Sequence, residues 1–229
     1  MKPKPRTYKE GGAKRRVLVV TSVQAEREAV LRGLEQTEGI EAEVLVAGVG
    51  LAQAAASTAM ALSAASYDWV INAGIAGGFP GKTDIGSLVL SSEIIAADLG
   101  AETGEGFCFL DQLELGTSRI PADAEFVCWM EQALQHKGIS VTTGPILTVS
   151  TVTGTQETAE ELIRRVPEAA AEGMEGFGVA TAARLQGVPV FEMRAVSNFV
   201  GPRNRAAWRI NEALQTLEKA SSALTEVVR

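Results

Sequence analysis

The sequence predicts an α/β fold, a single three-layer α/β/α domain built around a mixed, mostly parallel central sheet. Short apolar runs alternate with helical patterns along the chain, and this alternation is typical of parallel strands joined by helices that cover both faces of a sheet. Hydrophobic residues make up 46% of the 229 residues and aromatic residues only 5%, so Ala, Val, Ile and Leu must build the core. This length supports one such domain with a large core.

In the first half of the chain, apolar runs bounded by polar residues or glycine predict strands. Residues 17–20 form such a run between Arg15-Arg16 and Thr21-Ser22, which is typical of a buried parallel strand. We expect the glycine-rich residues 73–78 to follow the third strand. The predicted strands are residues 17–20, 42–46, 68–72 and 87–96, and the predicted helices are residues 25–34 and 51–65.

The second half of the chain alternates in the same way after a polar, glycine-containing stretch, residues 98–120, that we expect to be a long loop. No internal repeat or linker interrupts it, so one domain is expected over residues 17–229, after a disordered basic tail over residues 1–16. The tail has no apolar segment of the kind that a secretory signal needs. The predicted helices are residues 122–137, 157–165, 175–185 and 208–228, and the predicted strands are residues 141–150 and 188–196.

Polar or glycine-rich residues stand just beyond the ends of several predicted strands. In open α/β sheets, ligands bind outside the carboxyl ends of the strands, so we expect these residues to share one site. His136, the single histidine, falls near the end of a polar predicted helix, and no histidine-based mechanism is expected. The residues at the strand ends are Glu26, Gly48, Gly77-Gly78, Glu175 and Asn198.

The order of these segments resembles the nucleoside phosphorylase and nucleosidase superfamily. An acidic residue after the first strand is followed by Gly48-Val-Gly50, Asn72-Ala-Gly-Ile-Ala-Gly-Gly78, Gly173-Met-Glu175 and Arg194-Ala-Val-Ser-Asn198. The resemblance implies a nucleoside phosphorylase-like fold, a small-molecule purine nucleoside substrate and a homo-oligomer, either a dimer or larger. Within the superfamily, residues 197–208 look most like the futalosine hydrolases, which cleave futalosine to hypoxanthine and dehypoxanthinyl futalosine on a route to menaquinone.

The resemblance assigns the attacking water and the ribose to two glutamates. Glu26 matches the position that orients or deprotonates water in the hydrolases of the superfamily, and glycosidic hydrolysis needs a carboxylate opposite the leaving group. Glu28, two residues later, is the alternative. Glu175 would accept hydrogen bonds from the 2′- and 3′-hydroxyls, with Met174 against the ribose face. Glutamates are also favoured at helix N-termini without any such role.

Asn198 is the residue expected to meet the purine. Nucleosidases that act on adenine compounds have aspartate here, which donates a proton to N7. An amide can instead accept from a protonated N7 and donate to O6 of hypoxanthine, although it can also pair with N6 and N7 of adenine, which leaves an adenine substrate open. Gly77, Gly78, Val152 and Thr153 are expected to line the same base pocket.

The group at the 5′ position of the nucleoside is expected to meet Phe107, Arg203, Arg205 and Trp208, because arginine suits a carboxylate on that group. Relatives can lend the loop that carries Phe107 across a dimer interface. Arg194, on an apolar strand, is either a site residue or half of a structural ion pair. Phosphorylases of the superfamily bind phosphate near Gly48 and Gly50, where this chain has no basic residue, so water is favoured as the nucleophile.

The composition excludes several other classes of function. The net charge of −7 argues against a nucleic-acid partner, because phosphate binding needs a basic face. No apolar run approaches the roughly 18 residues that span a bilayer, and Cys108 and Cys128 lack metal-ligand spacing. We expect a cytoplasmic N-ribosyl hydrolase with no metal and no organic cofactor. The alternatives are a methylthioadenosine/S-adenosylhomocysteine nucleosidase, a purine nucleoside phosphorylase and a non-catalytic nucleoside-binding protein.

Overall fold

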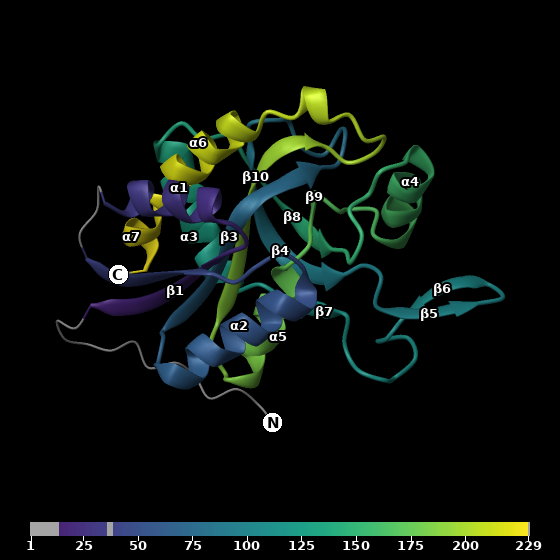
Figure 1. Ribbon diagram of the computed structural model, residues 1–229, viewed down its shortest axis with the longest axis horizontal. Helices are drawn as coiled ribbons and strands as arrows, with labels where there is room; N and C mark the ends of the chain where they lie inside the picture. The colour runs from purple at the N-terminus through teal and green to yellow at the C-terminus, as the bar shows by residue number, and fades with distance from the viewer. Residues whose placement is uncertain (1–13, 36–38, 229) are drawn as a thin grey trace.

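The computed structural model describes residues 14–35 and 39–228, and within them an eight-stranded mixed sheet forms the centre of the molecule (Figure 1). The strand order is β2-β1-β3-β10-β4-β8-β9, and β7 adds to β4. Because β9 also pairs with β3, the strands from β3 to β9 in this order close into a ring. The strands are β1 (Arg15–Thr21), β2 (Ile40–Val46), β3 (Trp69–Gly78), β4 (Leu88–Ala96), β7 (Arg119–Pro121), β8 (Val141–Thr148), β9 (Ala171–Gly173) and β10 (Val190–Phe199).

Most strand pairings in this sheet are parallel. The pairs β1–β2, β1–β3, β3–β10, β4–β8 and β8–β9 are parallel, whereas β10–β4, β3–β9 and β4–β7 are antiparallel. The predicted mixed, mostly parallel sheet is therefore confirmed. The parallel strands β1, β3 and β10 all end at the same edge of the sheet, and Glu26, Gly77 and Asn198 lie at or near these strand ends.

Helices cover the sheet in two groups, each with its own apolar core (Figure 1). Residues of α1, α3, α6 and α7 pack with one side of the sheet, and residues of α2 and α5 pack with the other. α4 lies apart from both groups and packs on a smaller cluster that includes Phe79 and Leu147. The helices are α1 (Gln24–Leu34), α2 (Leu51–Ala64), α3 (Ala124–His136), α4 (Gln156–Arg165), α5 (Gly176–Leu185), α6 (Ile210–Ser221) and α7 (Leu224–Val227).

The alternating strands and helices are confirmed, with ends that differ from the prediction by a few residues. β1 begins at Arg15, two residues earlier than predicted. Arg15 pairs with Ile40 of β2, and its Nη1 lies 3.5 Å from Asp68 Oδ1. Residues 15 and 16 therefore belong to the sheet rather than to the predicted tail, and residues 1–13 of that tail lie outside the described residues.

The glycine-rich residues 73–78 do not follow the third strand but continue it. They pair with β10 on one side, and Gly77 and Gly78 also pair with β9 on the other. Local sequence favours a turn at repeated glycines, but two neighbouring strands satisfy the backbone here. The prediction missed β9, Ala171–Gly173, because three residues are too few to show a period.

The predicted loop over residues 98–120 is wrong. It contains a two-stranded hairpin, β5 (Gly100–Thr103) and β6 (Gly106–Phe109), and it ends in β7. The hairpin projects from the body of the molecule beside α4 (Figure 1).

The predicted helix over residues 208–228 is divided into two helices, α6 and α7. A short 3-10 turn, Arg205–Ala207, precedes α6. None of the helices in the described ranges has both the length and the apolar composition that crossing a bilayer requires.

Candidate active site

Glu26 lies in the first turn of α1 and ties that turn to β3. Its Oε2 accepts hydrogen bonds from Ser22 N (2.9 Å), Ser22 Oγ (2.7 Å) and Val23 N (3.2 Å), and its Oε1 accepts one from Ile75 N (2.9 Å). The residue is only 2% exposed. Glu28, the alternative, is exposed. Of these two glutamates, Glu26 is therefore the one held at the end of the sheet.

Glu175 stands at the N-cap of α5 and connects α5 to the start of α2. Its Oε1 accepts a hydrogen bond from Gly50 N (3.2 Å), and its Oε2 accepts one from Arg194 Nη2 (3.2 Å). Gly50 has φ 94°, a backbone conformation that favours glycine. The glycine-containing turn after β2 therefore positions the ribose-binding candidate Glu175 through its backbone N–H.

Arg194 is the buried centre of this site. It is 1% exposed and donates from Nε to Glu192 Oε1 (2.8 Å) as well as to Glu175. Asn72 Nδ2 donates to the same Glu192 oxygen (2.9 Å). Burial alone would lower the pKa of Arg194, but the carboxylates of Glu192, Glu175 and Glu26 outweigh it and raise that pKa. Arg194 therefore forms buried ion pairs with Glu192 and with Glu175, and Glu175 is one of the predicted site residues.

Gly74 allows Glu26 and Arg194 to approach each other. A Cβ built on Gly74 would lie 2.6 Å from Glu26 Oε1 and 2.6 Å from Arg194 Nη1. A methyl group at this position would displace the Glu26 carboxylate or the Arg194 guanidinium, so glycine leaves room for their close approach. The water candidate Glu26 and the ribose candidate Glu175 are thus both within reach of one guanidinium.

Asn198 is the second-last residue of β10, next to a β-bulge. The pairing register with β3 shifts between Val196 and Asn198, so that Asn198 pairs with Gly77. Such bulges re-aim a side chain. Ser197 Oγ donates to Asn198 Oδ1 (2.8 Å), and Asn198 Nδ2 donates to Phe199 O (3.0 Å). These two bonds hold the amide while leaving one N–H and one lone pair free.

Thr153 is held against the sheet by a buried acid, Glu172. Thr153 N donates to Glu172 Oε1 (2.9 Å), and the Thr153 hydroxyl donates to Glu172 Oε2. Burial raises the pKa of Glu172, although the two bonds from Thr153 oppose that rise. Glu172 is a residue of β9 and pairs with Gly77 of β3. Val152, the other predicted wall residue, is 38% exposed beside Thr153.

Comparison with known proteins identifies the family of this chain. Residues 20–229 match the family model described as the phosphorylase superfamily. The chain belongs to the phosphorylase superfamily. The matched residues include the site residues above, all of the helices given for the fold and every strand of the described sheet except most of β1.

Relatives at 48% and 44% identity have the name futalosine hydrolase. The one from Streptomyces coelicolor is 48% identical over 93% of this chain and 96% of its own length, and the one from Acidothermus cellulolyticus is 44% identical over 90% and 89%. Among solved structures, a 5′-methylthioadenosine/S-adenosylhomocysteine nucleosidase from S. pneumoniae superposes with a TM-score of 0.81 at 20% identity, covering 93% of this chain and all of that chain. The nucleoside phosphorylase-like fold that the sequence predicted is therefore confirmed.

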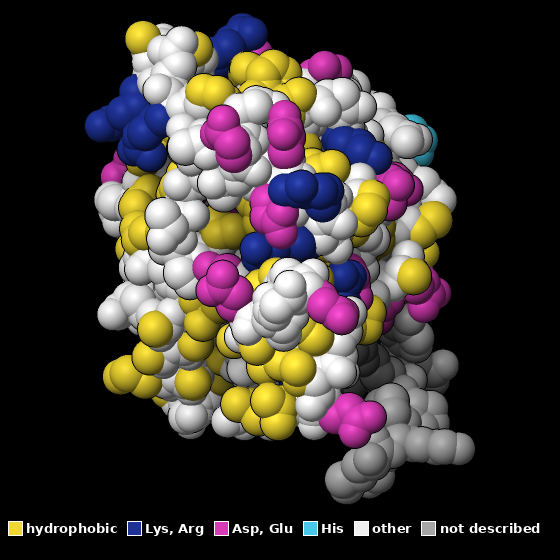
Figure 2. Space-filling view, turned by 90° about the vertical axis from the view of Figure 1, so that its right-hand side faces the viewer, with side chains coloured by type: hydrophobic (Ala, Val, Ile, Leu, Met, Phe, Trp, Pro, Cys, Tyr) yellow, Lys and Arg dark blue, Asp and Glu magenta, His cyan; other side chains and the backbone are white. Residues whose placement is uncertain are grey.

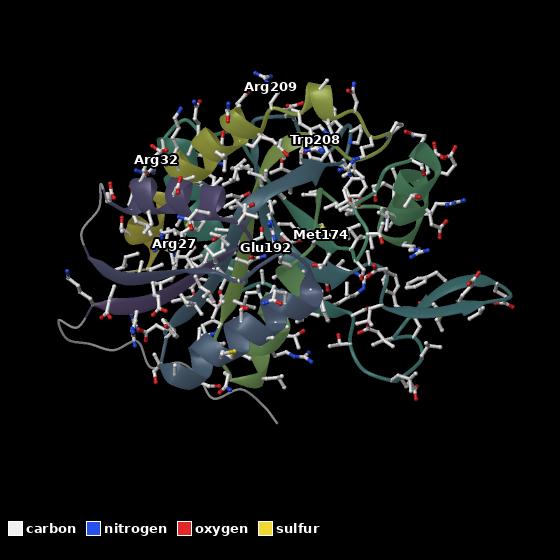
Figure 3. All side chains as sticks on the ribbon, in the orientation of Figure 1. Arg27, Arg32, Met174, Glu192, Trp208 and Arg209 are labelled. Atoms are coloured by element: carbon white, nitrogen blue, oxygen red, sulfur yellow. The ribbon has the colours of Figure 1, made fainter. Side chains whose placement is uncertain are left out.

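In this member of the superfamily, the segment after β10 gathers three of the four residues predicted for the 5′ group. The guanidinium carbons of Arg203 and Arg205 lie 5.3 Å and 5.9 Å from the centre of the Trp208 ring. Arg203 N also donates to Gly154 O (3.1 Å), which brings this segment against the loop that carries Thr153. Figure 3 shows Trp208 beyond the end of β10, away from the labelled Glu192 and Met174 nearer the centre.

The fourth residue, Phe107, lies elsewhere in the chain, on the β5–β6 hairpin. The guanidinium carbon of Arg165 lies 3.9 Å from the centre of its ring, and the Phe109 ring centre is 5.0 Å away. Phe107 lines a cavity of about 600 Å³ between the hairpin and α4, whose other walls include Arg119 and Glu161. Figure 2, which views this side of the molecule, shows basic and acidic side chains next to one another near its centre.

Sequence reasoning missed Asn72, Glu172 and Glu192 as members of this site. Asn72 stands inside a quoted segment and Glu172 directly before one, but their side-chain partners lie 120 and 19 residues away along the chain. Glu192 is a carboxylate in a strand that is buried at nearly every position. That anomaly is a usable signal, because a buried charge needs a partner or a function.

Proposed function

We propose that this protein hydrolyses the N-glycosidic bond of futalosine and releases hypoxanthine and dehypoxanthinyl futalosine. The observation that carries the proposal is that Glu26, after β1, and Glu175, after β9, both lie near the buried Arg194, while Asn198 lies further along β10, opposite Gly77 of β3. The names of the relatives at 48% and 44% identity support the choice of substrate.

Glu26 would act as the general base. Its Oε2 already accepts three hydrogen bonds, whereas its Oε1 accepts one, from Ile75 N. A carboxylate has about four lone-pair positions, so Oε1 has one left for a water molecule. Oε1 is also the oxygen that lies over Gly74 near Arg194. Water held there would attack C1′ of the ribose as the bond to the base breaks.

Glu175 would bind the ribose hydroxyls and stabilise the charge that develops on the sugar. The transition state of glycosidic hydrolysis resembles an oxocarbenium ion, and a fixed carboxylate beside it favours that positive charge. Oε1 accepts one bond, from Gly50 N, whereas Oε2 accepts two, from Arg194 and from Met174 N (3.4 Å), so Oε1 is the oxygen that keeps a position for a hydroxyl. Met174, beside Glu175 in the chain, would lie against the face of the ribose.

Asn198 would support the departing base. Ser197 fixes the direction of its Oδ1. The remaining lone pair on Oδ1 would accept a hydrogen bond from a protonated N7, while the free N–H donates to O6. Trp208, with Arg203 and Arg205 beside its ring, would meet the carboxylate-bearing arm at the 5′ position. The Arg194 guanidinium is already paired with two carboxylates, which supports water rather than phosphate as the nucleophile.

A product assay tests this proposal. Purified protein is incubated with futalosine or with 5′-methylthioadenosine, each with and without phosphate, and the released base and sugar are measured. We expect hypoxanthine from futalosine at a rate that phosphate does not change. Release of adenine alone would instead favour the methylthioadenosine/S-adenosylhomocysteine nucleosidase that other relatives at about 30% identity are named for, and dependence on phosphate would favour a phosphorylase.

The setting of this activity completes the proposal. Its product would enter a route to menaquinone, and the reaction would take place in the cytoplasm. We expect a homo-oligomer, in which the hairpin that carries Phe107 is the part of this chain able to reach a neighbouring subunit, since it projects from the body of the molecule (Figure 1). Light scattering of the purified protein measures the size of the oligomer.

A further inference from the structure

Glu172 is a buried carboxylate to which the mechanism above gives no role. It is 5% exposed, and among the described residues its hydrogen bonds come from Thr153 alone, with no cation paired to it. A second acid, Asp98, lies close enough to raise its pKa further. Burying an ionisable group without a counter-charge is unfavourable. Such a group in a site wall is therefore a candidate for binding a donor on the ligand.

The sheet places Glu172 and Asn198 on either side of Gly77. Gly77 pairs with Glu172 of β9 and with Asn198 of β10. Residues paired directly across neighbouring strands project to the same face, so the two side chains share a face with glycine between them. Neighbouring strands are about 4.8 Å apart, which puts the two backbones on the order of 10 Å from each other.

Gly77 and the side chain of Val200 give the sheet an apolar surface next to Asn198. A Cβ on Gly77 would lie 3.4 Å from Asn198 Nδ2 and 2.9 Å from Val200 Cγ2. The Asn198 amide therefore leans toward Gly77, and Val200 lies beside it. A planar base can lie on such a surface with one edge toward Asn198 and another toward Glu172.

The Glu172 carboxylate favours a ligand that presents a hydrogen-bond donor to it, because an ionised carboxylate can only accept hydrogen bonds. The N–H and O–H of Thr153 both point to the carboxylate, so these two donors are used. Each carboxylate oxygen keeps one lone pair free. In a 6-oxopurine N1 carries a hydrogen and donates, whereas in a 6-aminopurine N1 is an acceptor whose lone pair an ionised carboxylate repels.

We propose that Glu172 accepts the N1–H of a 6-oxopurine and is the residue that rejects 6-aminopurines. This inference rests on the proposed function, because it names a contact within the same base pocket. Asn198 and Glu172 together then read three atoms of the base: N7, O6 and N1–H. Sites built to hydrogen-bond a substrate group reject an analogue that lacks it, because their own polar groups are left without partners.

The first experiment measures kcat/KM for futalosine and for its 6-amino counterpart. Glu172→Gln keeps the shape of the side chain but places an amide donor beside N1. We expect the preference for the 6-oxo compound to fall by about 10- to 100-fold, the effect of one hydrogen bond to a charged group. Glu168→Gln is the matched control. Glu168 lies in the segment just before β9, is exposed, and forms an ion pair with Lys82. A Glu172→Gln protein that is folded and keeps the native preference overturns the inference.

A second experiment uses the native protein and depends neither on a variant nor on turnover. Binding of hypoxanthine, 1-methylhypoxanthine and adenine is measured by calorimetry. Methylation replaces the N1 hydrogen, so we expect 1-methylhypoxanthine and adenine to bind at least about 10-fold more weakly than hypoxanthine. Equal binding of hypoxanthine and 1-methylhypoxanthine contradicts the role of Glu172. If futalosine is not cleaved but hypoxanthine still binds more tightly than 1-methylhypoxanthine and adenine, the proposed reaction is wrong. The proposed hydrogen bond from N1–H to Glu172 is then still supported.

Discussion

At the scale of single residues, Arg194 is what allows three acidic side chains to share this site. Its guanidinium is paired with Glu175 and Glu192 and lies near Glu26. Removing one partner from a buried ion pair leaves an uncompensated charge, which destabilises far more than replacing the whole pair. The site is therefore a single electrostatic unit, although Glu26 and Asn198 remain separable because their own hydrogen bonds come mainly from nearby backbone and serine groups.

The first residue-scale prediction concerns the attacking water. Glu26→Gln should bind hypoxanthine normally but lower kcat by roughly 10²- to 10⁴-fold, because an amide cannot take the proton of water. Steady-state kinetics on futalosine and calorimetry with hypoxanthine measure the two effects. Glu28→Gln is the control, since Glu28 lies two residues away and is exposed. A native rate in Glu26→Gln would remove Glu26 from the mechanism.

The second concerns the leaving base. Asn198→Asp places a carboxylate near O6, so kcat/KM for futalosine should fall by about 10- to 100-fold, the range of one charge-assisted hydrogen bond. The rate on the 6-amino counterpart should rise relative to it, because a protonated aspartate can donate to N7. Asn211→Asp, which adds the same charge on the exposed side of α6, should change neither rate. An unchanged preference in Asn198→Asp would argue for an adenine-type substrate.

At the scale of elements, the packing of α5 on α2 sets where Glu175 stands. A Cβ on Gly178, in the first turn of α5, would lie 2.2 Å from Leu51 O at the start of α2. The two helix starts can therefore touch only because this residue is glycine. The same contact keeps the Gly50 N–H within 3.2 Å of Glu175 Oε1. The packing of the two helices and the position of Glu175 thus depend on one small residue.

Gly178→Ala tests this dependence. Backbone must move to admit the methyl group, and we expect the free energy of unfolding to fall by about 1–3 kcal/mol, as overpacking commonly does. A domain of this size loses roughly 2–4 °C in Tm for each kcal/mol. KM for futalosine should rise as Glu175 is displaced. Gly104→Ala serves as the control because nothing lies within 4 Å of its Cβ position, and equal Tm values for the two variants would refute the packing argument.

At the scale of the whole molecule, ring closure through β9 buries acids in the middle of the protein. Burial raises the pKa of Glu192 as well as that of Glu172, and the charge of Arg194 opposes the rise at Glu192. For an acid whose pKa is raised on folding, the native state binds the proton more tightly than the unfolded state. Both residues should therefore make the native state less stable as the pH rises above 4.5, the ordinary value for glutamate.

The pH dependence of unfolding measures this effect at Glu172. We expect Glu172→Gln to gain stability relative to the native protein as the pH rises from about 4.5, because the glutamine has no proton to lose. Denaturant unfolding of both proteins across the pH range in which they remain folded gives the difference in free energy. Glu168→Gln, at an exposed position, should show no such trend. A difference that does not vary with pH would mean that Glu172 titrates alike in the folded and unfolded states.

The sequence by itself determined the alternation of strands and helices, the sheet type, and the place of Glu26 and Glu175 beyond strand ends, whereas Asn198, predicted just beyond a strand, lies inside β10 because that strand runs on to Phe199. These features depend on short-range patterns: the period of apolar residues, and the rule that ligands lie at the carboxyl ends of parallel strands. The ordered segments also indicated the superfamily, which the match over residues 20–229 confirms.

Only the tertiary structure decided how those segments meet. Whether the glycines of β3 form a turn or a strand depended on β10 and β9, which arrive about 100 residues later along the chain. The bulge at Ser197 aims Asn198, and the partners of Arg194 include an acid that no local motif marks. The reason is physical: hydrogen bonding across strands and the pairing of buried charges are interactions between distant residues, and a local pattern contains no information about which distant residue will arrive.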